Sequence, residues 1–403
     1  MNIELIGDTP FSSLYAKRDT SVFSVTMAIP GGAMAEEEGQ LGYAHLLEHM
    51  VFRGTKKYPT SKDLAMEIEG VGGRYNGFTT FDAIYFTATV PAPFWQNAVD
   101  VIFSLAYEPL LEETALSIEK QVVISEIQMS EDQPEERAYS YLQKLMWDGH
   151  RMGEDVAGRR EDVENATKPK IESFWKSMFS RKPCIAMVGP MEANVVQSFI
   201  EKLHPPFELN SERLSIDAPS FHAGESRVRE DTQQLYYRKA LRGSSTTSDD
   251  IFTYQLISNI LGGSSFSQLF LRIREEEGLS YSVYSNIEGT SVAGSLVIAC
   301  DLKPNGLDKA KEIVDEELEK LSQGELDEEQ LEKFKRFTLG AYTMGLESTS
   351  TISMLLADRF LSRGIIWNPD SEINYIRSID VGKISSALRE SLDGGSAEVV
   401  LGP

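Results

Sequence analysis

Two histidines and a glutamate lie close together near the start of the chain, in the run His45-Leu46-Leu47-Glu48-His49. On a helix, residues four positions apart share a face, so the two imidazoles can bind one metal ion. Glu48 lies close to that face and can reach a water molecule on the metal. A zinc ion with one open position lowers the pKa of its water from about 15.7 to about 7. The pattern therefore predicts hydrolysis, with the metal-bound water as nucleophile and Glu48 as general base.

The motif is informative because histidine is rare in this chain. Only five of the 403 residues are histidine, and two of the five are in this short run. A single histidine on an apolar helix is usually structural. Two histidines at this spacing, with a glutamate between them, indicate a metal site instead.

A third metal ligand has to come from another part of the chain. The segment 112–129 is expected to be a helix and offers two glutamates, Glu119 and Glu126. They are seven residues apart and therefore lie on one face, two turns from each other. Both could also be solvated side chains of an acidic protein, and their spacing alone does not choose between them.

The second half of the chain repeats the plan of the first half. Pro91 and Pro190 are 99 positions apart, as are Pro304 and Pro403. At an offset of 213 positions, the strand expected at 22–29 also falls on a strand-like segment, 235–242. We therefore predict an α+β protein with two homologous domains, each a mainly antiparallel sheet with helices packed on one face.

The repeat divides the chain into a catalytic zinc-binding domain (1–204), a linker (205–222) and a homologous domain without metal (223–403). The linker begins with two consecutive prolines, which favour an extended connection. In the second copy, Ser258, Leu261 and Gly262 stand where the first copy has the motif residues, so this copy cannot bind zinc in the same way.

The same offset of 213 positions shows which residues of the second copy correspond to Glu119 and Glu126. Glu126 corresponds to Leu339, whereas Glu119 corresponds to a second glutamate, Glu332. Glu126 thus belongs with the residues that the second copy lacks.

Composition limits the partners and the compartment. The net charge of −23 argues against nucleic acid, which needs a basic face, and suits either basic peptides or simple solubility. No apolar run approaches the roughly 20 residues needed to span a membrane. Residues 1–11 lack the pattern of a signal peptide. The two cysteines, Cys184 and Cys300, are expected to be buried free thiols of a cytoplasmic protein.

In combination, the motifs resemble the inverted-zincin metallopeptidases of the pitrilysin and insulinase family. The resemblance covers nearly the whole chain. In the first half it depends on residues 45–50, 52–55, 72–79, 119 and 125–127, and in the second half on residues 261–263 and 274–281.

The resemblance implies one zinc ion per chain, with Glu126 as its third ligand and Glu119 as an auxiliary carboxylate that positions Glu126. It also implies that Asn76, Gly77 and Phe78 belong to an edge strand, to which a peptide substrate adds as a further strand. Gly77 stands where the family usually has alanine, which is expected to loosen this strand without abolishing the pairing.

Family members enclose a chamber with four homologous domains, and this chain has two. Its similarity to mitochondrial processing peptidase subunits and bacterial two-domain relatives (peptidasomes) implies a dimer, here of identical chains. Arg274 and Tyr281 would then contact the substrate opposite the metal, reaching across from the partner chain. Without the resemblance, these two residues would be interpreted as a surface arginine and a core tyrosine.

The leading interpretation is therefore a zinc-dependent endopeptidase that cleaves unfolded peptides or small proteins inside a closed dimeric chamber. An alternative is a catalytically silent core or scaffold subunit of the same fold. Such subunits typically lose the zinc motif, which is intact here. A third interpretation is a zinc hydrolase that acts on a different bond, and only a peptidase would produce new amino termini from a mixture of peptides.

Overall fold

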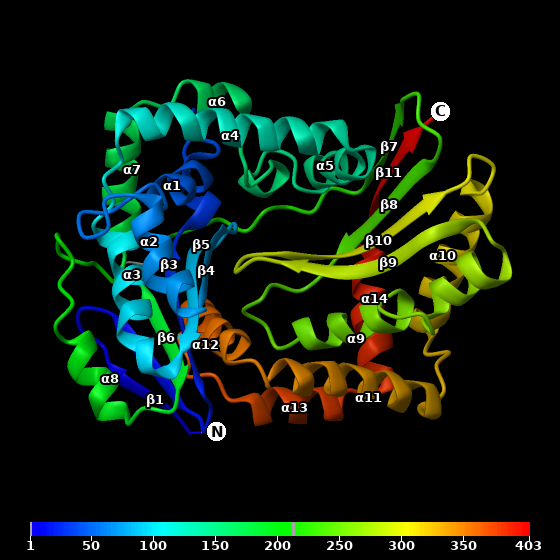
Figure 1. Cartoon of the computed structure of the whole chain (residues 1–403). Helices are drawn as coiled ribbons and strands as arrows, with labels where there is room; N and C mark the ends of the chain where they lie inside the picture. The colour runs from blue at the N-terminus through cyan, green and yellow to red at the C-terminus, as the bar shows by residue number, and fades with distance from the viewer. Residues whose placement is uncertain (1, 212–213) are drawn as a thin grey trace. The chain divides into compact units, whose positions relative to one another are not determined.

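A computed structural model describes residues 2–211 and 214–403 (Figure 1). The chain forms two compact units, each built on one sheet. Unit 1 comprises Met1–Gln128, Asp155–Ile216 and Met344–Trp367, and unit 2 comprises Met129–Glu154, Asp217–Thr343 and Asn368–Pro403. In the described part of the chain, no helix is both long enough and apolar enough to cross a bilayer.

The sheet of unit 1 has six strands in the order β1-β2-β6-β3-β5-β4. All neighbouring pairs are antiparallel except β2 and β6, which are parallel. The strands are β1 (Asn2–Gly7), β2 (Ser12–Lys17), β3 (Val22–Pro30), β4 (Arg74–Thr79), β5 (Ala83–Pro91) and β6 (Cys184–Gly189).

The apolar face of this sheet follows from the alternating sequence of β3. Phe23, Val25 and Met27 are fully buried in the main hydrophobic core of the unit. Helices α1, α2, α3 and α7 pack against strands of the sheet, and each of them contributes side chains to this core. The helices of the first half are α1 (Tyr43–Val51), α2 (Ser61–Ile68), α3 (Trp95–Tyr107), α4 (Glu113–Asp132), α5 (Pro134–Met146), α6 (Arg160–Glu164), α7 (Lys168–Phe179) and α8 (Ala193–Ile200).

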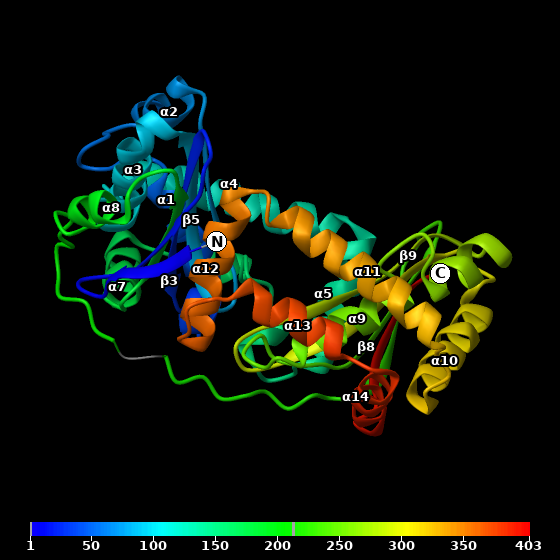
Figure 2. The same ribbon diagram turned by 90° about the horizontal axis from the view of Figure 1, so that it is seen from below.

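The other face of the sheet is polar and is covered by α12 (Thr349–Arg363), a helix from the second half of the sequence. Hydroxyl groups join the two elements. Ser24 Oγ lies 2.8 Å from Thr349 Oγ1, and Thr26 Oγ1 lies 2.9 Å from Ser353 Oγ. Figures 1 and 2 both show this orange helix beside the blue and cyan strands of unit 1.

The sheet of unit 2 has five strands in the order β7-β11-β8-β10-β9, and only β7 and β11 are parallel. Helix α5, from the first half of the sequence, packs against β8 and β11. The strands are β7 (Gly224–Arg229), β8 (Leu235–Arg242), β9 (Ser280–Gly289), β10 (Gly294–Leu302) and β11 (Ser396–Gly402), and the helices are α9 (Ile251–Leu261), α10 (Leu307–Gln323), α11 (Glu328–Gly345), α13 (Pro369–Ser378) and α14 (Val381–Asp393).

Single-turn and irregular helices complete the two units. Four are 3-10 helices: η1 (Gly32–Ala35), η2 (Glu69–Val71), η3 (Ala92–Phe94) and η4 (Arg151–Gly153). The fifth, η5 (Phe270–Glu276), is a π-helix.

The predicted α+β fold with two similar, mainly antiparallel sheets is confirmed. The predicted division at residues 205–222 needs a correction at two places, because segment 129–154 belongs to unit 2 and segment 344–367 belongs to unit 1. The physical reason is the polar face of each sheet, which a helix from the other half of the sequence covers. A repeat shows that both halves contain such a helix, but it does not show which sheet the helix covers.

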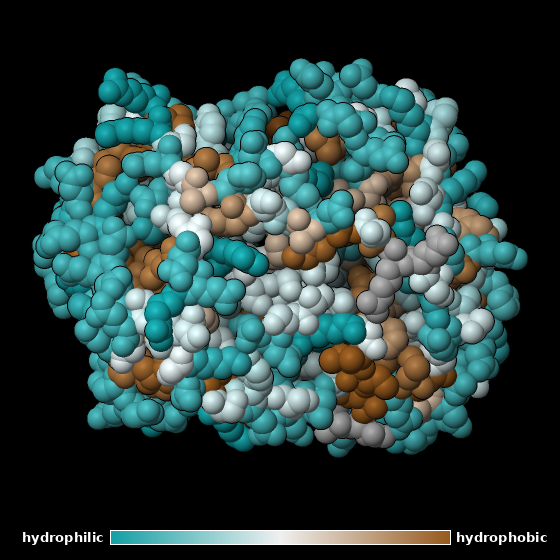
Figure 3. Space-filling model, turned by 180° about the vertical axis from the view of Figure 1, so that it is seen from behind, coloured by the Kyte–Doolittle hydropathy of each residue, from teal (hydrophilic) through white to brown (hydrophobic). Residues whose placement is uncertain are grey.

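The surface is mainly polar, as expected for a highly charged chain, and the two cysteines are buried. On the face drawn in Figure 3, hydrophilic side chains cover most of the surface, and apolar residues gather in a few small patches. Both cysteines are buried free thiols, as predicted. Burial raises the pKa of Cys300 to about 12 and raises that of Cys184 as well.

Candidate metal centre

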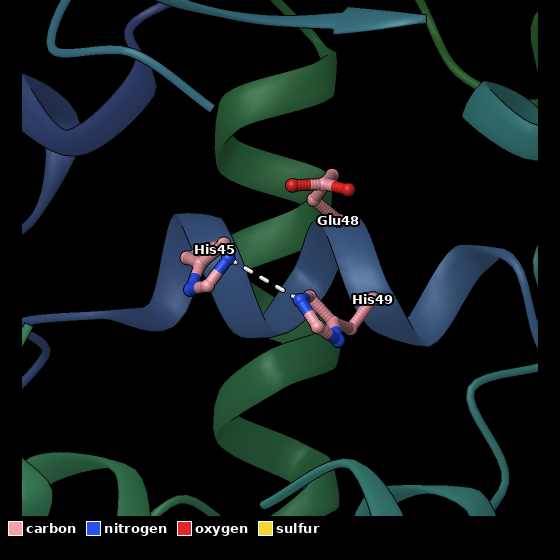
Figure 4. A group of neighbouring side chains, drawn as sticks. All are labelled: His45, Glu48 and His49. Carbon is pink, nitrogen blue, oxygen red and sulfur yellow. Dashed lines mark hydrogen bonds between the residues drawn. The ribbon is translucent and has the colours of Figure 1, made fainter. Parts of the chain in front are cut away.

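Helix α1 carries the two histidines and the glutamate of the sequence motif. Its apolar residues, among them Leu46, Leu47 and Met50, are buried in the core of unit 1. Burial of that face leaves the imidazoles of His45 and His49 together on the other side, one helical turn apart. Figure 4 shows the two imidazoles next to each other, with a dashed line between their nearest nitrogens and the carboxylate of Glu48 close by. The ring planes are nearly perpendicular, at 84°.

Three ligand atoms converge in front of α1. His45 Nε2 and His49 Nε2 are 3.2 Å apart. Glu126 Oε2, which α4 supplies, lies 3.7 Å from the first nitrogen and 3.6 Å from the second. Ligands that bind one tetrahedral zinc ion at 2.0–2.2 Å are separated by roughly 3.3 Å. The spacing and the chemistry of these three atoms therefore fit a zinc ion.

Glu119 lies behind His49 and is not beside the other ligand atoms. Its carboxylate is almost fully buried (3% exposed), and its Oε2 lies 3.0 Å from His49 Nδ1. Arg53 Nε donates a hydrogen bond to the second oxygen, Oε1. A proton on Nδ1 that is bound to a carboxylate leaves Nε2 free to ligate a metal. The structure therefore places Glu126, and not Glu119, next to both Nε2 atoms.

This arrangement corrects one expectation about Glu119. The resemblance implied that this carboxylate positions Glu126, but its contacts are with His49 and Arg53. Glu119 and Glu126 are on the same helix two turns apart, and only the docking of α4 against α1 decides which atom each one meets. Sequence reasoning missed the contact of Arg53, although this residue follows His49 by one helical turn, which is the available signal.

The surroundings of the site shift the pKa values of His45 and His49 in opposite directions. Burial, followed by the charge of His49, lowers the pKa of His45 to about 4. Burial also disfavours charge on His49, but the hydrogen bond with Glu119 and the nearby carboxylates outweigh it, and the pKa of His49 is raised. Burial alone would raise the pKa of Glu119, but its bonds with His49 and Arg53 lower it. His45 is thus neutral at pH 7, as a metal ligand must be.

Glu48 is buried (8% exposed) and has no cationic side chain bonded to it among the described residues. Burial raises the pKa of this carboxyl group, against the opposing effects of His49 and Thr79. Thr79 Oγ1 donates a hydrogen bond of 3.3 Å to Glu48 Oε2. A carboxylate whose pKa is moved toward neutrality is suited to accept and return a proton. Sequence reasoning did not single out Thr79, which is far from Glu48 in the chain.

The predicted edge strand is confirmed as β4, which among the described residues pairs only with β5. Asn76 is exposed at this edge, and Phe78 stacks on Tyr85 with ring centroids 4.8 Å apart. Gly77 points toward α1, because a Cβ atom built on it would lie 2.9 Å from Glu48 Oε1. The predicted substrate strand therefore passes next to the carboxylate of Glu48 on α1.

Arg274 and Tyr281 belong to unit 2. Arg274 is on the π-helix η5, where its exposed guanidinium lies 4.8 Å from the ring centroid of Phe270. Tyr281 is on β9, an edge strand, and is 76% exposed, so it is not a core tyrosine.

Comparisons with known proteins identify the family of the chain. Residues 14–160 match the family model described as insulinase (peptidase family M16), and residues 165–337 match the model described as peptidase M16 inactive domain. The chain belongs to the M16 insulinase family. The resemblance stated from the motifs is thereby confirmed. The inactive-domain match includes the first part of the second copy, with positions 258, 261 and 262, where the motif residues are replaced.

Two curated relatives match this chain along most of their length. An uncharacterised zinc protease of Bacillus subtilis is 26% identical over 365 residues, which cover 90% of this chain and 88% of that protein. An uncharacterised zinc protease of Streptomyces coelicolor is 25% identical and covers 95% of this chain and 86% of that protein. The zinc in these names agrees with the donor set that α1 and α4 bring together.

Two solved structures show the same fold. A protease from Helicobacter pylori superposes with a TM-score of 0.91 at 21% identity, over the whole of both chains. A peptidase M16 inactive domain from Pseudomonas fluorescens gives a TM-score of 0.90 at 17% identity and covers 100% of this chain and 98% of that one.

The substitution Glu119→Gln tests the role of this carboxylate in the M16 site. The amide keeps the size of the side chain but loses the charge that holds the His49 proton. Zinc affinity, measured by competition with a chromogenic chelator, should fall by about 10- to 100-fold, the usual effect of losing such a partner. Glu113→Gln, on an exposed position of the same helix, should leave the affinity unchanged. Equal affinities for the two variants would contradict the role.

Proposed function

We propose that this chain is a zinc-dependent endopeptidase, in which His45, His49 and Glu126 hold one zinc ion and Glu48 is the general base. The observation that carries the proposal is the convergence of three ligand atoms at separations of 3.2–3.7 Å, with a buried carboxylate beside them. Closed structural zinc sites use four protein ligands, whereas three ligands with an adjacent base are typical of hydrolytic sites.

Each side chain of the site has a separate part in the reaction. Zinc bound there would polarise the scissile carbonyl and lower the pKa of the attacking water. Glu48 takes the proton from that water on its carboxylate and passes it to the leaving amine. Glu119 keeps the proton of His49 on Nδ1, so that Nε2 stays available to the metal.

The edge strand β4 indicates the class of substrate. A peptide that adds to this edge would be held mainly by backbone hydrogen bonds, which require an extended chain but little sequence preference. Unfolded peptides and small proteins meet this requirement. The net charge of −23 favours basic peptides among them.

A homodimer with a closed chamber completes the proposal. Arg274 and Tyr281 are exposed on unit 2, and we infer that they contact the substrate at the zinc site of the partner chain. Each zinc site would thus combine α1 and α4 of one chain with η5 and β9 of the other. The buried free thiols suit a reducing compartment, and we place the enzyme in the cytoplasm.

A catalytically silent subunit remains the alternative. The enzyme is favoured over this alternative because, among the described residues of unit 1, the two imidazoles lie within hydrogen-bonding or ion-pair distance of Glu119 and Glu126. The inactive-domain model matches only residues 165–337, outside the motif.

The substitution Glu48→Gln separates metal binding from catalysis. It should leave one zinc per chain, because Glu48 is not one of the three ligands, and it should lower kcat by about 10²- to 10⁴-fold, the usual contribution of a general base. Metal content and the release of new amino termini from a mixed peptide digest measure the two effects. A variant with near wild-type turnover would remove Glu48 from its role.

Mixing two inactive variants tests whether the site is shared between chains. Glu48→Gln protein lacks the base, and Arg274→Ala protein lacks the substrate contact. In a mixed dimer with shared sites, one site recovers both residues, so random exchange between identical chains should restore about a quarter of wild-type activity. If each site is built from a single chain, no activity returns after exchange.

A further inference from the structure

One face of the edge strand β4 is in contact with the general base. Three residues of the strand point toward α1, namely Tyr75, Gly77 and Thr79. Thr79 donates its hydroxyl hydrogen bond to Glu48 Oε2 at 3.3 Å. Gly77 borders the other oxygen of the same carboxylate, because a Cβ atom on this residue would lie 2.9 Å from Glu48 Oε1. Each oxygen of Glu48 is therefore next to one residue of β4.

We propose that Thr79 is a positioning residue for Glu48, because its hydroxyl group donates a hydrogen bond that fixes one oxygen of the carboxylate. The inference rests on the proposed function, because it concerns how the general base is placed. It assigns a second task to the strand that receives the substrate. The scissile peptide and the base then take their positions from the same element, which sets the distance between them within a fraction of an ångström.

The substitution Thr79→Val tests the hydroxyl, since valine has nearly the same shape but no donor. It should lower kcat by about tenfold, the scale of one hydrogen bond to a charged group, with little change in KM or zinc content. Thr79→Ser is the matched control and should restore most of kcat, because serine keeps the hydroxyl. Wild-type kcat in the valine variant would overturn the proposal, as would loss of zinc, which would assign the hydroxyl to the metal site.

Crystal structures of the variants give a second readout, independent of turnover. In Thr79→Val, the Glu48 carboxylate should be displaced from its wild-type position, while the two histidines stay in place. In Thr79→Ser, the carboxylate should keep its wild-type position. An unmoved carboxylate in the valine variant would overturn the proposal. If the wild-type protein cleaves no peptide, the proposed function fails, but the carboxylate positions still decide whether β4 places Glu48.

Discussion

The candidate site depends on the docking of two helices whose polar residues have to meet at one point. Helix α1 offers its two imidazoles one turn apart, and α4 offers a carboxylate to both. Neither helix alone can bring the two imidazole nitrogens and the carboxylate oxygen together. Leu46 and Met50 of α1 and Val123 and Ile127 of α4 belong to the same hydrophobic core of unit 1. Burial of these apolar faces holds the ligand atoms at separations that suit one ion, so the chemistry follows from the packing.

Two buried glutamates of the site have different environments and therefore different uses. Burying an ionised carboxylate costs several kcal/mol unless it gains partners. Glu119 has two, His49 and Arg53, and its pKa is lowered. Glu48 has one neutral donor, Thr79, and its pKa is raised. The first carboxylate stays charged and orients an imidazole, whereas the second can exchange a proton. Their surroundings, and not their residue type, separate an orienting carboxylate from a base.

Much of this site could be predicted from the sequence because it depends on local spacing. The helical period places His45 and His49 on one face, whereas the edge strand β4 was expected only from the family resemblance. Contacts between distant segments were not predictable in the same way. Glu119 and Glu126 share a helix face, and the repeat and the family resemblance favoured Glu126 as the ligand. The contact of Glu119 with His49 Nδ1 depends on the docking of α4 against α1. Two further features depend on which surfaces pack together, and the periodicity of the sequence does not specify that packing. One is the exchange of α5 and α12 between the units, and the other is the hydrogen bond from Thr79 to Glu48.

The most direct test of the account is a crystal structure with anomalous scattering measured on both sides of the zinc absorption edge. The account predicts one zinc ion in unit 1, at about 2.0–2.2 Å from His45 Nε2, His49 Nε2 and Glu126 Oε2, the usual range for such ligands. The carboxylate of Glu119 should remain on His49 Nδ1, away from the ion. Two results would contradict this account. One is a zinc ion bound through Glu119 instead of Glu126, and the other is zinc-saturated protein with no anomalous peak between the two histidines.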